Sequence, residues 1–311
     1  MIEAIDYEPS LKAQWDGFVT SAKNGMFLFQ RDFQDYHQDR FPDSSLMFLE
    51  GGRLVALLPA SRSGDEIVSH GGLTYGGILS GSDMSTSRML AVFDAMLQKF
   101  RRDGARRLLY KAIPIFCHRH PAQEDLYALF RNDARLVRRD AGFILRPSAR
   151  PRYSSLRERS LKKASKAGLT LVETEDFVPY WKMLTEVLRD RHEAQPVHTL
   201  EEIQLLKSRF PDQIRLFVAM LAGETVAGTL VFEDLVFAHT QYIAAGPAGR
   251  ETRALDLVYD RLFTEIYADK PWFSFGAATE DQGRVLNAGL AEWKEGFGAR
   301  ATMLDFYAIS L

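Results

Sequence analysis

The sequence has little cysteine and almost no excess of either charge. Its 311 residues include a single cysteine, Cys117, which excludes an intramolecular disulfide framework and a metal cage built from thiolates alone. The Cys117 to His120 segment lacks a second pair of ligands at zinc spacing, so we predict no metal. Basic and acidic residues number 39 and 41. Any contact with a polyanion must therefore be local.

Long apolar runs and several common enzyme signatures are also missing. No apolar run approaches the ~20 residues that span a bilayer, and the start, Met1 to Glu8, is acidic where a secretory signal would be basic. The sequence has no Gly-x-Ser-x-Gly elbow, no nucleotide phosphate loop and no dinucleotide fingerprint, so hydrolases, nucleoside triphosphatases and dehydrogenases lack their defining parts. We expect a cytoplasmic protein without membrane contact, and its length and 46% hydrophobic residues predict about two domains.

The two halves of the chain show the same order of predicted elements. Each has two helices, an apolar hairpin around a Gly-containing turn, a strand, a helix and a further strand. The hairpins are 46–58 and 214–230, and the strands that follow place His70 in register with His239 and Gly77 with Gly246. In the second half, Thr199 and Glu202 form a capping-box pattern at a helix start. The parallels predict a duplication.

A basic segment joins the halves. Residues 150–168 carry seven Lys or Arg side chains and one acidic side chain, Glu158. The segment predicts a linker followed by a helix from about Ser155 to Lys166. It is either an ordinary solvated helix or a surface for the phosphates of a nucleotide, a coenzyme or RNA.

The element order is that of the GNAT N-acetyltransferase fold. Two such units joined by a basic helix resemble the Fem-type (FemAB-like) peptidoglycan aminoacyltransferases. The residues that carry the resemblance are 159–171, 177–193, 196–203, 239–245 and 287–298. The resemblance implies an α/β protein of two tandem GNAT-like mixed-sheet units, with a first unit at 1–149, a connecting helix at 150–168 and a second unit at 169–311 that holds the donor site.

The resemblance implies an N-acyltransferase. Acyl-coenzyme A would donate an acetyl or longer acyl group to an amine on a cell-envelope precursor, an amino sugar or an amino acid. The alternatives are transfer from an aminoacyl-tRNA to a peptidoglycan precursor, with tRNA bound by the basic helix, and a non-catalytic protein that binds a ligand with the same fold.

The donor loop follows the central strand of the second half. In the GNAT family, backbone N–H groups at the start of the next helix bind the coenzyme pyrophosphate. The residues here are Ala244, Ala245, Gly246, Gly249, Arg250 and Arg253. They depart from the family pattern Arg/Gln-x-x-Gly-x-Gly/Ala, and Arg253 stands where a small residue is expected. The matching loop of the first half has no basic residue before Arg88. We therefore assign donor binding to the second half and expect the first half to shape the acceptor site or an interface.

Transfer to an amine needs a proton acceptor and donors for the oxyanion. Under strand alternation, His239 and Gln241 share one face of the central strand and suit these roles; His239 is otherwise a hydrogen-bonded core histidine. Glu280 follows the next strand, where it acts as a base or caps the following helix. The resemblance adds Lys294 and Tyr307, because that helix and the strand after it border the acceptor channel in Fem-type proteins.

The acceptor prediction rests on polar residues near the two early helices of the second half. Arg191, His192 and His198 flank the turn between these helices, which covers the acceptor site in the GNAT fold. Asn287 lies seven residues before Lys294 and is predicted on the same helix face. A basic, His-containing turn favours an anionic acceptor, although a polar surface turn explains the same residues.

Overall fold

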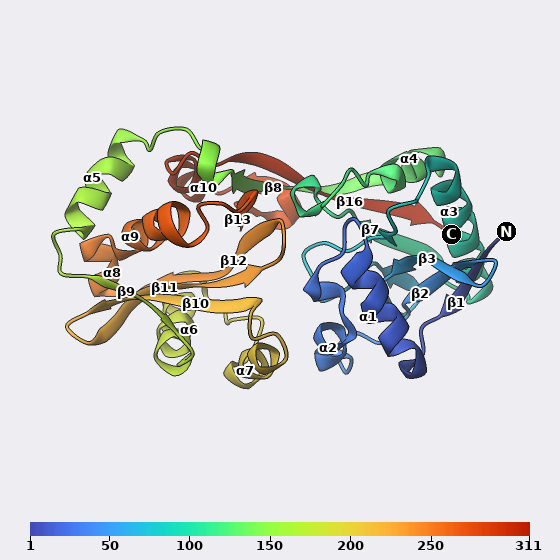
Figure 1. Ribbon diagram of the computed structural model, residues 1–311, viewed down its shortest axis with the longest axis horizontal. Coiled ribbons are helices and arrows are strands. Elements are labelled where there is room, and N and C mark those ends of the chain that lie inside the picture. The colour runs from blue at the N-terminus through green and yellow to red at the C-terminus, as the bar shows by residue number, and fades with distance from the viewer. The chain divides into compact units, whose positions relative to one another are not determined.

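The computed structural model describes residues 1–311, except the side chains of Arg191 and His192. The chain forms two compact units (Figure 1). The first contains Met1–Ala141, Thr279–Val285 and Met303–Leu311, and the second contains Gly142–Ala278 and Leu286–Thr302. No helix of the described residues is both long and apolar enough to cross a membrane.

The first unit contains a four-stranded sheet of order β1-β2-β3-β6 and the β4-β5-β7-β16 part of a ten-stranded sheet. Its strands are β1 (Ile2–Asp6), β2 (Leu46–Glu50), β3 (Arg53–Leu58), β4 (Ser61–Ser63), β5 (Glu66–Val68), β6 (Leu79–Ser80) and β7 (Arg107–Lys111), and its helices are α1 (Lys12–Ser21), α2 (Arg31–Gln34), α3 (Thr86–Arg102) and α4 (Glu124–Arg131). Two long strands, β8 (Arg135–Leu145) and β16 (Arg300–Ser310), contribute residues to both units, and β14 (Thr279–Glu280) and β15 (Val285–Leu286) form a short pair.

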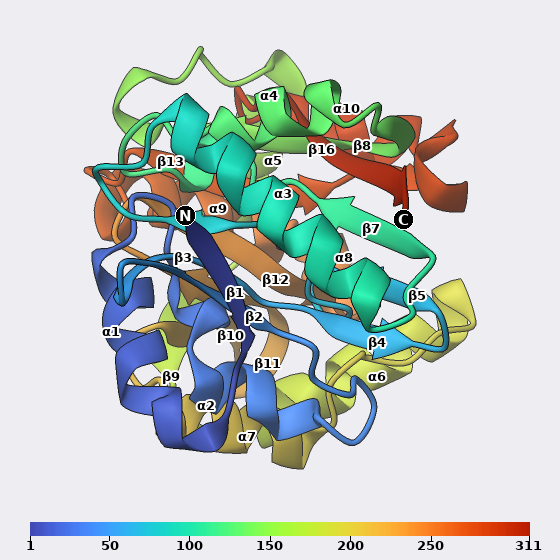
Figure 2. The ribbon, with the colours of Figure 1, turned by 90° about the vertical axis from the view of Figure 1, so that its right-hand side faces the viewer.

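Helix α3 covers the core of the first unit, and Figure 2 shows it lying over the strands beside α4. Its buried residues recur at helical spacing and face the sheets: Met89, Val92, Phe93, Met96, Leu97 and Phe100. They pack with Leu108 and Tyr110 of β7. Because alternate side chains of a strand point to opposite faces, Arg107, Leu109 and Lys111 lie on the other face of β7.

The second unit contains the β8-β13-β12-β11-β10-β9 part of the ten-stranded sheet, which is mixed, and the helices that pack on it. Its own strands are β9 (Thr170–Thr174), β10 (Ile214–Leu221), β11 (Glu224–Glu233), β12 (Phe237–Ala245) and β13 (Trp272–Ala277), and its helices are α5 (Ser155–Ala164), α6 (Val178–His192), α7 (Leu200–Arg209), α8 (Pro247–Thr252), α9 (Ala254–Arg261) and α10 (Ala288–Glu295). The predicted capping box is confirmed, because Thr199 and Glu202 accept each other's backbone N–H groups at the start of α7.

The two units differ where the central strand should lie. In the second unit β12 is a continuous strand of nine residues, whereas residues 67–77 of the first unit form the end of β5 and a glycine-rich turn. His70 lies in this turn with φ 55°, so it is no strand counterpart of His239. A Cβ at Gly72 would approach His37 Nε2 to 2.1 Å, and Gly77 has φ 94°. The turn therefore folds back tightly against its own unit instead of extending.

The end of the chain returns to the first unit. Residues 303–311, which include most of β16, belong to it, and β16 pairs antiparallel with β7, with Phe306 opposite Lys111. The boundaries expected from the sequence, which assign all of 169–311 to the second unit, do not include this return. Segment 279–285 also belongs to the first unit.

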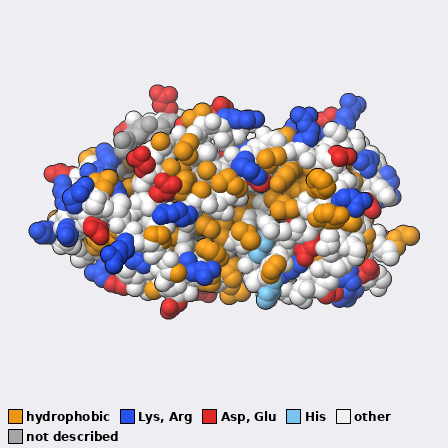
Figure 3. All heavy atoms as spheres, turned by 90° about the horizontal axis from the view of Figure 1, so that it is seen from above, with side chains coloured by type: hydrophobic (Ala, Val, Ile, Leu, Met, Phe, Trp, Pro, Cys, Tyr) orange, Lys and Arg blue, Asp and Glu red, His pale blue; other side chains and the backbone are white. Residues whose placement is uncertain are grey.

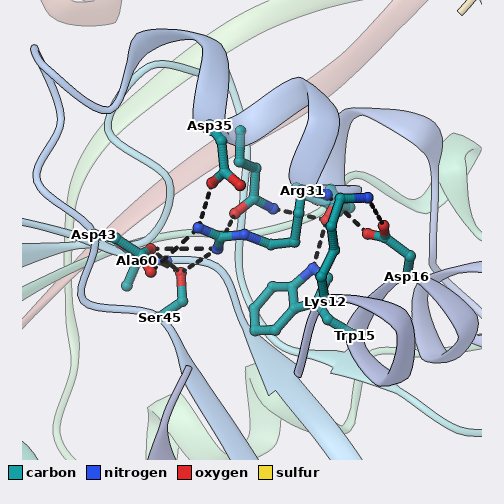
Figure 4. Close-up of polar contacts among 10 residues, drawn as sticks. Lys12, Trp15, Asp16, Arg31, Asp35, Asp43, Ser45 and Ala60 are labelled. Atoms are coloured by element: carbon teal, nitrogen blue, oxygen red, sulfur yellow. Dashed lines mark hydrogen bonds and ion pairs between the residues drawn. The ribbon is translucent and has the colours of Figure 1, made fainter. Parts of the chain in front are cut away.

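A buried arginine connects the early helices of the first unit to its hairpin sheet (Figure 4). Arg31 is 3% exposed and starts α2. Its guanidinium pairs with Asp35 at 2.5 Å and Asp43 at 3.2 Å, and it stacks 3.8 Å from the Tyr7 ring centroid. Ser45 and Gln34 accept further hydrogen bonds. One side chain of α2 thus contacts the residue that follows β1, Tyr7, and the segment that precedes β2.

Replacing Arg31 should strongly destabilise the protein. In Arg31→Met, the Asp35 and Asp43 carboxylates lose their buried cationic partner. We therefore expect the free energy of unfolding to fall by roughly 3 kcal/mol. Urea denaturation measures the change. The control is Arg53→Met, which removes the exposed pair with Asp83 and should change stability by less than about 1 kcal/mol. Equal effects of the two substitutions would contradict the role given to Arg31.

Candidate active site

The centre of the second unit is the strand β12, which lies between β11 and β13. Its parallel pairing with β13 covers three positions, from Phe237 opposite Trp272 to His239 opposite Ser274. Along β11, Leu230 pairs with Tyr242 and Val231 with Thr240, so Gln241 is an extra residue in β12. This is a β-bulge, which redirects a strand and is frequent beside active sites. The bulge begins two residues after the last pairing with β13.

The bulge changes which residues share a face of β12. Thr240 hydrogen-bonds the Tyr259 hydroxyl of α9 at 3.0 Å, whereas Tyr242 contacts His198 and Trp181 of the α6 and α7 region. Thr240 and Tyr242 therefore lie on opposite faces, and the simple alternation predicted for 238–243 is wrong after residue 240. The extra residue is the physical reason, because it shifts the alternation by one position.

His239 lies against β13 at the point where the pairing ends. Its Nδ1 is 3.0 Å from the Ser274 hydroxyl, and Ser274 also accepts the N–H of Gly276 at 3.2 Å. Gly276 has φ 70°, and a Cβ there would stand 3.4 Å from the His239 ring. Burial and the charge of Lys294 lower the pKa of His239 to about 4. A histidine with so low a pKa is a poor general base near neutral pH.

Lys294 approaches the same place from α10. It is 3% exposed, and its ammonium donates to the carbonyl oxygens of Ala277 at 2.7 Å and Gly276 at 3.1 Å. Burial lowers the pKa of this lysine to about 8. An ammonium has three N–H donors, so one remains for a ligand oxygen. The structure thus brings His239 and Lys294 together at the end of the β12–β13 pairing.

An aromatic cluster fixes α9 and α10 on the sheet. Tyr259 lies 5.2 Å from Trp293 and 5.0 Å from Phe275 between ring centroids, and Phe297 lies 5.1 Å from Trp293. Edge and tilted contacts of this kind add to the area that the rings bury. Because Trp293 precedes Lys294, the cluster also sets the position of the lysine.

The predicted donor loop forms the start of α8. Gly246 is its N-cap, and a Cβ at Gly249 would come within 2.1 Å of the Val226 carbonyl oxygen, so α8 lies directly on β11. Arg250 donates to the Ala245 carbonyl at 2.7 Å. Arg253 has φ 62° and separates α8 from α9. A small residue is expected at this position, and the left-handed backbone explains why, because glycine adopts that conformation most easily.

A pocket of about 540 Å³ adjoins this loop. Residues of α6, of the start of β11 and of the loop line it, including Met183, Val226 and Gly246. Two cations, Lys182 and Arg250, face three carboxylates, those of Glu186, Asp190 and Glu224. The lining therefore does not concentrate positive charge, unlike a typical site for a polyanion. Ala244 and Ala245 are buried at the end of β12.

The residues predicted for the acceptor are spread more widely. His198 is buried, and its Nδ1 lies 2.7 Å from the Tyr242 hydroxyl, so it adjoins β12. Asn287 is the N-cap of α10 and accepts the Leu290 N–H. It precedes the helix, so the predicted helix face shared with Lys294 is wrong. The Arg191 and His192 side chains lie outside the described part of the chain.

Two predicted catalytic residues belong to the first unit. Glu280 is exposed, and Tyr307 donates a hydrogen bond to Asp305 at 3.2 Å and packs against the core of the first unit. Within the second unit, by contrast, sequence analysis missed Ser274 and Tyr242. Ser274 stands between Phe273 and Phe275. A hydroxyl inside an otherwise apolar strand was the sequence signal that could have identified it. Tyr242 lies in the predicted strand, but alternation placed it opposite His239.

Comparison with solved structures shows the fold. FemX superposes with a TM-score of 0.70 at 10% identity over 99% of this chain and 97% of FemX. A conserved protein of unknown function from Bacteroides thetaiotaomicron gives 0.63 at 11% identity, with 100% of both chains covered, and L-PGS from Bacillus licheniformis gives 0.59 at 13%, covering 89% of this chain and 90% of L-PGS. No protein-family model and no curated protein sequence matches. The predicted fold class, a mixed α/β protein of two units with the fold that FemX shares, is confirmed.

His239 should make stability depend on pH in the acidic range. Its pKa is lowered from 6.5 to about 4 in the folded state, so the unfolded chain binds more protons between these values and stability rises as the pH increases through this window. We expect the free energy of unfolding, measured with urea, to rise from pH 4 to pH 6.5 less steeply in His239→Gln than in the parent. The same slope in both proteins would contradict the burial of a neutral His239.

Proposed function

We propose that this protein is a transferase that moves an acyl group to an amine, with the chemistry at the end of the β12–β13 pairing. The observation that carries the proposal is the bulged central strand with His239 and Lys294 beside it. The likeness in fold to FemX supports it. The acceptor is an amine on a cell-envelope precursor, an amino sugar or an amino acid.

The residues suggest direct attack on the acyl carbonyl. The amine nitrogen forms a bond to the carbonyl carbon, the bond to the leaving sulfur or oxygen of the donor breaks, and the proton that the nitrogen loses ends on that sulfur or oxygen. Lys294 has one N–H group beyond its two backbone acceptors and supplies it to the developing oxyanion. With a pKa of about 8, it also exchanges protons near neutral pH. His239 positions Ser274 and the β13 backbone, and Gln241 offers its amide at the bulge.

The first candidate donor is acyl-coenzyme A. Its pyrophosphate would bind beside the α8 loop, with Gly246 and Gly249 allowing close approach and Arg250 and Arg253 supplying charge. The pantetheine arm would then follow the pocket that Met183 and Val226 line. Acyl-coenzyme A is thus the first co-substrate that we propose.

A second donor, an aminoacyl-tRNA, is favoured by two features. The three carboxylates of the α8 pocket suit the ammonium group of an aminoacyl ester better than a pyrophosphate. Helix α5 also presents the exposed cations Arg159, Lys162 and Lys163, and the exposed Lys166 follows the helix. Arg157 is buried in an ion pair of 2.6 Å with Asp256. Figure 3 shows Lys and Arg side chains, with Asp and Glu among them, at the end of the second unit that carries α5. A phosphate backbone binds such a surface in a salt-dependent way.

Thermal shifts with the two donors separate the candidates. A ligand that binds only the folded protein raises Tm, so acetyl-coenzyme A should stabilise the protein if the first donor is right, and aminoacyl-tRNA if the second is right. Arg250→Ala combined with Arg253→Ala should remove the coenzyme effect and spare the tRNA effect, and Lys162→Ala combined with Lys163→Ala should do the reverse. Stabilisation by neither donor would refute acyl transfer and favour a non-catalytic binding protein.

Lys294 should be needed for the transfer step. Lys294→Met removes the donor to the oxyanion, and we expect kcat to fall by about 100-fold with little change in KM. The matched control is Lys270→Met, which also removes a lysine bound to a backbone carbonyl, that of Asp234. Rates under single-turnover conditions with the donor identified above provide the measurement. An unchanged kcat in Lys294→Met would exclude the lysine from the chemistry.

A further inference from the structure

A glycine-rich turn of the first unit wraps around the end of β7. Residues 70–77, which include four glycines, lie between β5 and β6. The start of this turn contacts the side chain of Lys111, the last residue of β7, on the face opposite α3. The next residue after the turn, Ile78, donates its N–H to the Tyr110 hydroxyl in the core that α3 covers. Between these contacts, the Gly76 N–H donates to the Lys111 carbonyl at 3.0 Å.

The side chain of Lys111 is enclosed by residues 70–73, which we call the strap. It is 8% exposed, and its ammonium donates to the carbonyl oxygens of His70, Gly71 and Leu73 at 3.1, 3.3 and 2.6 Å. An ammonium has three N–H donors, so these contacts use all of them. The carbonyl groups of the strap therefore replace the water that an exposed lysine would bind.

The strap forms part of the wall of two cavities. One is a pocket of about 680 Å³ that residues of β4, β5, β7, β8 and β16 line, together with Lys111. The other is a cavity of about 20 Å³ beside Arg31 and His37, which is enough for about one water molecule. Gly71 lines both. Opening of the strap would join the two cavities and give Lys111 access to water.

The surroundings of Lys111 make the burial of its charge unfavourable. The charged residues that line the larger pocket with it are Arg40, Arg62, Glu66, Arg107 and Arg138. The single carboxylate of this set, that of Glu66, pairs with Arg107 at 2.8 Å. A buried charge without an opposite charge beside it is costly. Burial and the charge of Arg138 accordingly lower the pKa of Lys111 to about 8, so the ammonium is less favoured under the strap than in water.

The other titratable groups that contact the turn keep their charge state above neutral pH. Burial and the nearby His37 and Lys111 lower the pKa of His70 well below its usual value. Burial raises the pKa of Tyr110 well above its usual value, and burial raises the pKa of Asp125, which accepts the Tyr110 hydroxyl at 2.7 Å, to about 6. Within this set, Lys111 is the group that changes its charge between pH 7 and pH 9.

We propose that the strap opens when Lys111 carries a proton and closes over it when the amine is neutral. Opening returns the ammonium to water, whereas closing buries a neutral amine, which costs less. By linkage, the open state, in which the lysine has the higher proton affinity, is favoured as the pH falls. Gly71 and Gly72 give the strap the backbone freedom that this movement needs. The inference does not depend on the proposed transfer.

Hydrogen exchange of backbone N–H groups, followed by NMR on the intact protein, tests the proposal. The strap markers are Gly71, which donates to the Ser61 hydroxyl, and Leu73, which donates to the His70 carbonyl, and the reference is Ile78. The closed strap lowers the pKa of the lysine from 10.5 to about 8. The protection factors of both markers, corrected for the intrinsic exchange rate, should therefore be about 10-fold lower at pH 7 than at pH 9. That of Ile78 should not change.

Two substitutions of Lys111 should act in opposite directions. Lys111→Met carries no proton, so the strap should stay closed, with protection factors independent of pH and, at pH 7, higher than in the parent. Lys111→Arg is charged at both pH values, so protection should be low at pH 7 and at pH 9. The control, Lys12→Met, removes a lysine that pairs with Asp16 and should retain the 10-fold change. Circular dichroism and Tm verify that each variant is folded.

Two results would overturn the proposal. One is equal protection of the strap markers at pH 7 and pH 9 in the parent. The other is lower protection of these markers in Lys111→Met than in the parent, because it would show that the ammonium holds the strap shut. The measurements need no acyl donor, so their failure and that of the proposed function are distinguishable.

Discussion

The end of the pairing between β12 and β13 is the constraint on which the candidate site depends. Parallel strands in a sheet normally continue side by side, but here the bulge at Gln241 and the left-handed Gly276 interrupt both partners near the same place. The carbonyl groups of Gly276 and Ala277 then accept the Lys294 ammonium. The backbone carbonyls left without a strand partner are thus satisfied by the ammonium of a buried side chain.

The two units differ in the segment that follows their hairpins. In the second, a continuous central strand leads into the α8 loop and its mixed-charge pocket. In the first, a glycine-rich turn replaces the strand, and basic side chains outnumber acidic ones in the pocket that β4, β5, β7, β8 and β16 line. A duplicated fold thus keeps its helices and hairpins while the residues after the hairpin diverge, which accords with the general finding that fold does not determine function.

The sequence predicted the elements well because their signals are local. The stripe of α3, the capping box of Thr199 and the two hairpins depend on spacing within a few residues. The bulge at Gln241 escaped prediction because it depends on how β11 pairs with β12, which no local pattern reveals. Asn287 was assigned to a helix face because the helix start was placed one residue early. The basic pocket of the first unit joins residues from five strands, and only the tertiary fold brings them together.

The return of the last strand has a consequence for the order of assembly. β7 obtains its neighbour β16 from residues 303–311, which the ribosome adds after all of the second unit. Domains of many proteins fold in turn as they are synthesised. Here the first unit can complete its sheet only after the second unit has been synthesised. Until then, the edge of β7 that pairs with β16 is uncovered in the nascent chain. A chain that lacks residues 303–311 therefore contains the whole second unit but an incomplete first unit.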